Sequence, residues 1–264
     1  MSADEQIDLG SHSLRLRAQG QGKISFVCLH GLIDRLDIWD PLLPGLLERG
    51  SVLRFDQRGH GESGAPPGPY TREDLAADVL GLLDARGLER SILVGHSMGG
   101  IVSMTTALLY PERIAGLVLL GTASHCNERT ARWYERIATA GETEGLPGLS
   151  RAIYGRHSEK PIQGDAQGIA HVTRTLKSLQ AEPLTSKLAT ICCPVLLIVG
   201  ANDPLGPRAS ELIAGALPSG AGTLEVIPDA GHWVHVEAQE RVLAALDSWL
   251  ASTHEARQKR EEGR

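Results

Sequence analysis

The chain has 264 residues, of which 42% are apolar and 22% charged, a balance typical of one α/β domain with an insertion or of two small domains. Its 26 Lys and Arg residues against 32 Asp and Glu residues give a net charge of −6. An acidic surface gains nothing from binding polyanions, so we expect neither nucleic acid nor a membrane as a partner. No apolar run approaches the roughly 18 residues that a transmembrane helix needs.

The first six residues are acidic and contain no apolar segment, which argues against a signal peptide. The four cysteines, at positions 28, 126, 192 and 193, show no zinc-type spacing. We therefore expect reduced, structural thiols in a cytoplasmic protein.

Six short apolar runs alternate with helical patterns along the chain. Unbroken apolar runs of this length, spaced by helices, predict parallel strands covered on both faces, and hence an α/β fold with a mostly parallel central sheet. The runs span residues 24–29, 52–55, 92–94, 117–120, 195–199 and 223–227, and a weaker alternating stretch of Ile7, Leu9, Leu14 and Leu16 precedes them.

The clearest helix is predicted after Thr71, where Thr71 and Asp74 resemble a capping box. Tyr70 can pack on Leu75 at the start of this helix, and Gly87 can end it. Further helices are predicted over residues 99–110, 209–217 and 237–250.

Residues 122–190 interrupt this alternation. They contain no strong strand pattern but carry charged helical segments at residues 128–140 and 168–180. We interpret residues 122–190 as a helical cap, inserted between two parts of a core at residues 1–121 and 191–251. Residues 252–264 are polar and charged, which indicates a frayed helix end or a disordered tail.

The sequence Gly95-His96-Ser97-Met98-Gly99 matches the nucleophile elbow G-x-S-x-G. An apolar run precedes it and a helical pattern follows it, which is the strand–turn–helix context that this motif requires. The glycines allow the strand and the helix to approach closely. We therefore predict Ser97 as a nucleophile exposed above the sheet.

A serine hydroxyl needs a base, and in this architecture an acid and a histidine follow the serine, each after a strand. Asp203 follows the run at residues 195–199, and His232 follows the run at 223–227. Both are predicted at the same edge of the sheet as Ser97. Asp229 and His235 are the second choices, because Asp229 is only three residues from His232 and His235 opens the next helix.

Two backbone N–H groups are predicted to stabilise an oxyanion: that of Met98, next to the nucleophile, and that of Leu32 in the loop after the first central strand. Gly31 would let the chain turn so that the Leu32 N–H faces the site. His30 is interpreted as a structural hydrogen-bonding group of this loop.

The glycine pattern at residues 59–64 spells G-x-G-x-x-G, but three prolines within residues 66–69 forbid the helix that a dinucleotide site requires. We instead expect Asp56, Arg58 and His60 to hold a sharp turn. A metal site at His232, His235 and Glu237 is not favoured, because no H-E-x-x-H motif is present. Neither a cofactor nor a metal is implied.

These motifs together resemble the α/β-hydrolase family over nearly the whole chain. The resemblance implies the α/β-hydrolase fold, with the helical cap inserted between strands. It rests on five segments, at residues 30–31, 56–63, 95–100, 200–204 and 231–233.

Within that family, residues 52–71 are similar to 3-oxoadipate enol-lactonases, although His30-Gly31 stands where those enzymes begin the oxyanion loop with Asn-Ser. Ser97 argues against haloalkane dehalogenases and epoxide hydrolases, which use an aspartate nucleophile. Carbon–carbon hydrolases of the meta-cleavage type and cofactor-free perhydrolases remain alternatives, as does a ligand-binding receptor on a hydrolase scaffold.

We expect a serine hydrolase acting on a small carboxylic ester or lactone, such as a carboxylesterase or lactonase, with Ser97 attacking, His232 as base and Asp203 orienting it. Because the base must be neutral, activity should fall below roughly pH 6–7, where histidines usually gain a proton. Bulky groups that could line the substrate pocket are Trp133, Tyr134, Ile137, Tyr154 and Trp233, although packing between cap and core is the simpler interpretation for each cap residue. The sequence does not indicate an oligomeric state.

Overall fold

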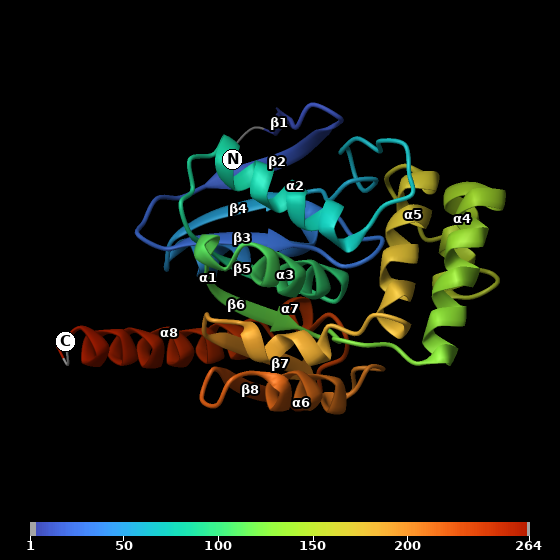
Figure 1. The fold of residues 1–264 in the computed structure, drawn as a ribbon. Coiled ribbons are helices and arrows are strands. Elements are labelled where there is room, and N and C mark those ends of the chain that lie inside the picture. Colours follow the sequence, from blue (N-terminus) through green and yellow to red (C-terminus); the bar gives the residue numbers. More distant parts are fainter. Residues whose placement is uncertain (1–3, 263–264) are drawn as a thin grey trace.

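The computed structural model describes residues 4–262, and of residues 256–262 only the backbone. Part of the predicted N-terminal segment (residues 1–3) and the last two residues of the predicted tail therefore lie outside the described residues. Eight strands form one sheet in the order β1-β2-β4-β3-β5-β6-β7-β8 (Figure 1). Their bounds are β1 Glu5–Asp8, β2 Ser13–Gln19, β3 Ser25–Leu29, β4 Ser51–Phe55, β5 Ser91–His96, β6 Ile114–Leu120, β7 Val195–Gly200 and β8 Gly222–Ile227.

All six apolar runs lie in strands β3 to β8, and these strands pair in parallel. The weaker alternating stretch forms β1 and β2, an antiparallel pair whose second strand also runs antiparallel to β4. The carboxyl ends of β3, β5, β7 and β8 therefore lie at one edge of the sheet, where the predicted site residues follow them.

Helices cover both faces of the sheet, which explains the unbroken apolar runs. One face packs against α2 (Arg72–Ala85), α3 (Met98–Leu109) and α6 (Pro207–Ala216). The other packs against the 3₁₀ helix η1 (Leu36–Trp39), α1 (Leu43–Leu47), α7 (Val234–Glu237) and α8 (Gln239–Glu262). A short 3₁₀ helix, η2 (Pro111–Arg113), precedes β6.

The capping box predicted at α2 is present. The Thr71 hydroxyl accepts a hydrogen bond from the Asp74 N–H (3.1 Å), and the Asp74 carboxylate accepts one from the Thr71 N–H (2.8 Å). Beyond the helix, Gly87 takes a φ of 62°, the left-handed conformation that ends many helices.

A helical segment connects β6 to β7. It contains α4 (Glu128–Tyr154), α5 (Ala166–Lys177) and the 3₁₀ helices η3 (Ser178–Gln180) and η4 (Thr185–Thr190). Figure 1 shows α4 and α5 side by side beyond one end of the sheet. The helix predicted to end near residue 140 continues through a kink at Gly145, where φ is 66°.

The loop between α4 and α5 is tied to the turn at residues 56–64. The Gly61 N–H donates to the Gln163 carbonyl (3.0 Å), and the Asp165 N–H donates to the Gly59 carbonyl (2.8 Å). A Cβ on Gly59 would lie 2.8 Å from the backbone of Gly168. The glycine-rich turn thus anchors the connecting segment.

The remaining predictions concern the end of the last helix, membrane spans and the cysteines. Helix α8 continues to Glu262, past residue 250 where the pattern predicted its end. Among the described residues, none of the helices combines the length and apolar character needed to span a bilayer. All four cysteines are free thiols, and burial raises the pKa of Cys28 to about 12.

Candidate active site

Ser97 occupies a sharp turn between β5 and α3. Its φ of 50° and ψ of −112° are an unusual combination for a residue with a side chain. The Ser97 N–H donates to the Leu120 carbonyl (2.9 Å), and the Thr122 hydroxyl donates to the Ser97 carbonyl (2.7 Å). The turn needs glycine on both sides of Ser97. A Cβ on Gly95 would lie 2.4 Å from the Gly99 carbonyl oxygen, and a Cβ on Gly99 would lie 2.1 Å from the Leu29 carbonyl oxygen.

Asp203 and His232 meet at the ends of two neighbouring strands. The His232 Nδ1 lies 2.9 Å from Asp203 Oδ2, and the carboxyl side chain is fully buried. Asp203 Oδ1 also accepts the Leu205 N–H (2.8 Å). A carboxylate can only accept a hydrogen bond, so His232 Nδ1 must carry the proton in this contact. In the neutral ring, Nε2 then keeps its lone pair.

The alternative acid and base are placed elsewhere. Asp229 is exposed, with a φ of 62°. His235 is fully buried between Trp39 and His96, whose ring centroids lie 4.7 and 4.5 Å away. Glu237 accepts the Gly231 N–H (2.6 Å) and the Trp233 N–H (3.2 Å), which is a role in holding the His232 loop. Within the described part of the chain, no cluster of metal-ligating side chains occurs.

His96 links the elbow to the His232 loop. Its Nε2 donates to the main-chain carbonyl of His232 (2.9 Å), and the centroids of the two rings lie 4.8 Å apart with their planes tilted by 55°. Its Nδ1 lies 3.7 Å from Asp34 Oδ2, too far for a hydrogen bond, and Asp34 Oδ2 accepts a hydrogen bond from Trp233 Nε1 (3.3 Å). Burial opposes charge on Asp34, but the contacts with His96 and Trp233 outweigh burial and lower the pKa of this carboxyl.

Sequence reasoning missed this connection of Asp34 with His96 and His232. The only local signals were a carboxylate directly after the oxyanion loop and a histidine inside the elbow. Neither indicates which partner it meets, because the three residues come from segments far apart in the chain: the loop after β3, the end of β5 and the loop after β8.

Of the two predicted oxyanion donors, Leu32 lies in the loop after β3 and Met98 is the first residue of α3. In the described part of the chain, neither the Leu32 N–H nor the Met98 N–H has a hydrogen-bond acceptor, and Met98 opens α3. The left-handed residue of the loop is Ile33 (φ 67°), not Gly31. Gly31 is needed for space, since a Cβ there would lie 2.8 Å from His96 Nδ1.

His30 is held on both sides by Gln57. The Gln57 N–H donates to His30 Nε2 (2.9 Å), and the Gln57 side chain donates to the His30 carbonyl (2.7 Å). His30 Nδ1 donates to the Gly31 carbonyl (2.8 Å), so the ring is neutral and structural, as predicted. Burial lowers the pKa of His30 below its ordinary value.

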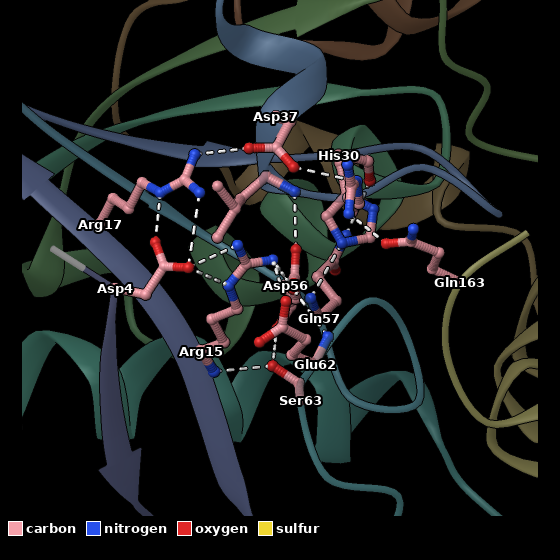
Figure 2. Close-up of polar contacts among 12 residues, drawn as sticks. Asp4, Arg15, Arg17, His30, Asp37, Asp56, Gln57, Glu62, Ser63 and Gln163 are labelled. Atoms are coloured by element: carbon pink, nitrogen blue, oxygen red, sulfur yellow. Dashed lines mark hydrogen bonds and ion pairs between the residues drawn. The ribbon is translucent and has the colours of Figure 1, made fainter. Parts of the chain in front are cut away.

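Charged side chains organise the turn at residues 56–64, and Figure 2 shows the polar contacts around Asp56 in this turn. Asp56 is fully buried and accepts the Leu36 N–H (2.7 Å), the Glu62 N–H (2.9 Å) and Arg15 Nη1 (3.2 Å). Arg58 binds Asp78 through two hydrogen bonds of 2.6 and 2.7 Å. The predicted turn is therefore present, and it connects β2, the oxyanion loop and the segment between α4 and α5.

A cavity of about 1310 Å³ lies between the strand ends and α4. Ser97, Asp203, His232 and Leu32 line it, and so do Trp133, Tyr134, Tyr154 and Trp233 from the predicted pocket set. Ile137 does not line it: this side chain is fully buried and packs with Leu149 and Ile169. The pocket prediction for Ile137 was wrong because Ile137 lies on the face of α4 that packs on the rest of the helical segment.

Comparison with known proteins agrees with this architecture. The profile of the alpha/beta hydrolase family matches residues 26–245, and the chain belongs to that family. It is 31% identical to 3-oxoadipate enol-lactonase 2 of Acinetobacter baylyi over 239 residues, covering 83% of this chain and 85% of that protein.

Solved structures give the same fold. The enol-lactonase from Burkholderia xenovorans superposes with a TM-score of 0.83 and 26% identity, covering 94% of this chain and all of that one. A thermophilic esterase from Thermogutta terrifontis, solved with malate bound, superposes with a TM-score of 0.83 and 27% identity, over 96% of this chain and 100% of that one. The chain is therefore a hydrolase with the α/β-hydrolase fold.

Proposed function

We propose that this hydrolase cleaves a small carboxylic ester or lactone with Ser97 as nucleophile, His232 as general base and Asp203 as the group that orients His232. The observation that carries the proposal is the 2.9 Å contact between Asp203 and His232 Nδ1, on a cavity that Ser97 also lines. This contact leaves His232 Nε2 free to accept the serine proton.

In the first half-reaction, Ser97 Oγ attacks the carbonyl carbon while His232 Nε2 takes the hydroxyl proton. The bond from the acyl carbon to the leaving oxygen breaks, and His232 returns the proton to that oxygen. In the second half-reaction, His232 takes a proton from water, which attacks the acyl-enzyme. The acid leaves and Ser97 regains its proton.

The negative charge of the tetrahedral intermediate needs fixed donors. The N–H groups of Leu32 and Met98 suit this role, because neither has an acceptor within the described residues. Loss of one such donor typically costs about 2.7–4 kcal/mol of transition-state stabilisation. Gln57, through its two bonds to His30, holds the loop that carries Leu32.

Two observations support an ester or lactone as the substrate. An enol-lactonase appears among both the sequence relatives and the solved structures, and an esterase appears among the latter. A serine positioned for acyl transfer uses the same steps for an open ester and for a lactone, since only the tether between acyl and leaving oxygen differs.

Stoichiometric labelling by a fluorophosphonate with peptide mapping, beside a panel of p-nitrophenyl esters and lactones, tests the proposal. We expect one label, at Ser97, and turnover of short-chain substrates. Ser97→Ala should lose both while unfolding at the temperature of the parent protein. Folded parent protein that is neither labelled nor active would overturn the proposal and favour a ligand-binding receptor.

Asp203→Asn tests the role of the acid. An amide at this position can stabilise the wrong tautomer of His232, so we expect kcat to fall by roughly 10³–10⁴-fold, with little change in KM. Steady-state kinetics on the best ester of the panel measures this. Asp229→Asn, at an exposed carboxyl on the loop that carries His232, should leave kcat within about twofold, and equal losses in both variants would contradict the assignment of Asp203.

A further inference from the structure

The cavity contains a carboxylate that the proposed mechanism does not use. It belongs to Asp34, in the loop between β3 and η1, two residues after the proposed oxyanion donor Leu32. Asp34 lines the same cavity as Ser97 and His232. Its side chain is largely buried, with 11% of its surface exposed. A buried acid in an ester site influences which substituents a substrate can place beside it.

The neighbours of Asp34 place its carboxylate close to both catalytic residues. Oδ2 accepts a hydrogen bond from the Trp233 indole (3.3 Å), and Trp233 directly follows His232. The same oxygen lies 3.7 Å from Nδ1 of His96, which directly precedes Ser97. Because the two contacts come from residues adjacent to the proposed base and nucleophile, we expect a substrate group at Asp34 to lie only a few bonds from the scissile carbonyl.

The second oxygen of this carboxylate is free. Among the described side chains and backbone groups, Asp34 Oδ1 accepts no hydrogen bond, and protein atoms do not enclose it. No described Lys or Arg side chain forms an ion pair with Asp34. Since Asp34 lines the cavity, Oδ1 is available to a molecule bound there.

The charge of Asp34 decides which groups suit this oxygen. Burial opposes ionisation, but the contacts with His96 and Trp233 lower the pKa of the carboxyl, so it is an anion at neutral pH. A carboxylate accepts hydrogen bonds and cannot donate them, and its bonds to donors are charge-assisted. A second carboxylate would be repelled, and an alkyl group would cover the oxygen without giving it a partner.

We propose that Asp34 is a specificity-determining residue, so that the preferred substrate is an ester or lactone with a hydrogen-bond donor, a hydroxyl or an ammonium group, close to the scissile carbonyl. This rests on the proposed function of Ser97. A purely structural role, in which Asp34 only holds Trp233, predicts no dependence on the substituent of the substrate.

The test uses methyl butanoates that carry one substituent, on C2 or on C3: methyl, hydroxyl, ammonium or carboxylate. Acid release at constant pH 7 gives kcat/KM, and the rates without protein correct for the intrinsic reactivity of each ester. In at least one of the two series, we expect the hydroxyl and ammonium esters to exceed the methyl-substituted ester by about tenfold or more. The carboxylate ester should be the poorest substrate of that series.

Asp34→Asn keeps an acceptor for the Trp233 indole but removes the charge. Relative to the methyl-substituted ester, we expect the preference for ammonium and the penalty for carboxylate to disappear and the preference for hydroxyl to shrink. Asp37→Asn is the matched control, since Asp37 lies three residues further along, forms an ion pair with Arg35 (2.9 Å) and does not line the cavity. It should keep the ratios of the parent protein. Thermal unfolding verifies that each variant is folded.

Ligand-observed NMR with Ser97→Ala separates this proposal from the proposed function, because it measures binding of the same esters without turnover. Tighter binding of the donor-bearing esters that is lost on adding Asp34→Asn supports the role of Asp34 even if the parent protein turns over no ester.

Equal ratios in the parent protein and Asp34→Asn, including an equal loss on all four substituents, overturn the proposal. So does a parent protein that prefers the methyl or carboxylate ester in both series, a result that needs no folded variant. The nucleophile proposal would still stand if Ser97 is labelled.

Discussion

At the scale of single residues, the site depends on positions where a side chain has no room. Gly121 follows β6 with a φ of 51°, and a Cβ there would lie 2.8 Å from Asp203 Oδ2 and 3.1 Å from the His232 carbonyl. Asp203 and His232, the proposed acid and base, thus pack directly against the backbone of Gly121. An added methyl group would move one of them.

Gly121→Ala is therefore predicted to lose activity beyond any loss of stability. We expect kcat to fall about 10²-fold, because a shift of about 1 Å in a catalytic group costs that much. Gly87→Ala is the control, since Gly87 has a similar φ of 62° but nothing within 4 Å of an added Cβ.

Both variants should lose roughly 1–2 kcal/mol of unfolding free energy from the left-handed backbone, and only Gly121→Ala should lose activity. Urea unfolding together with ester kinetics measures the two effects. A Gly121→Ala protein with the activity of Gly87→Ala would show that Asp203 and His232 tolerate the shift.

At the scale of elements, helix ends decide where the functional groups stand. Ser97 precedes α3, whose first N–H is a proposed oxyanion donor. The α2 helix begins at a capping box and packs Leu75, Val79, Leu82 and Leu83 onto the sheet. Arg58, in the glycine-rich turn, reaches this helix through Asp78, so α2 also supports the turn that anchors the segment between α4 and α5.

Thr71→Ala removes one hydrogen bond of the capping box and is predicted to lower the free energy of unfolding by about 1 kcal/mol. Thr143→Ala is the control. Thr143 lies inside α4, and among the described residues its hydroxyl bonds only to its own helix, at the Thr139 carbonyl (2.8 Å), so alanine there should be neutral or slightly stabilising. Urea unfolding at pH 7 compares them, and equal effects would contradict a capping contribution.

At the scale of the whole molecule, the core contains neutral histidines. His30, His60 and His235 are all fully buried. Burial, with help from nearby His30, lowers the pKa of His60 to about 3. Burial also lowers the pKa of His235 well below its ordinary value, with contributions from His96 and His232.

These histidines predict acid-sensitive stability. Below about pH 6.5 these histidines bind protons in the unfolded chain, whereas in the folded core they stay neutral. The free energy of unfolding therefore falls as the pH drops from 6.5 toward 3. Each such histidine adds a slope of up to about 1.4 kcal/mol per pH unit.

His60→Gln keeps a donor for the Arg58 carbonyl and should flatten the slope by up to about that amount, measured by urea unfolding at pH 7, 6 and 5. His125→Gln, at an exposed histidine, should keep the slope of the parent protein. An unchanged slope in His60→Gln would mean that His60 gains its proton in the folded state.

Much of this protein follows from the sequence by itself. The apolar runs located strands β3 to β8, the Thr71 and Asp74 pair located the start of α2, and the glycines around Ser97 located the elbow. The positions of Ser97, Asp203 and His232 directly after β5, β7 and β8 predicted that they meet at one sheet edge. Such signals are readable because periodicity, caps and tight turns depend on neighbouring residues.

The tertiary structure decided the rest. That His96 lies between Asp34 and the His232 loop, and that Ile137 turns away from the cavity, are relations between segments far apart in the chain. The position of a residue in the sequence indicates which face of an element it occupies, but not what the opposing element brings to that face. The residues of the proposed reaction were therefore visible in local sequence, whereas the side chains that contact them became visible only when the folded chain brought distant segments together.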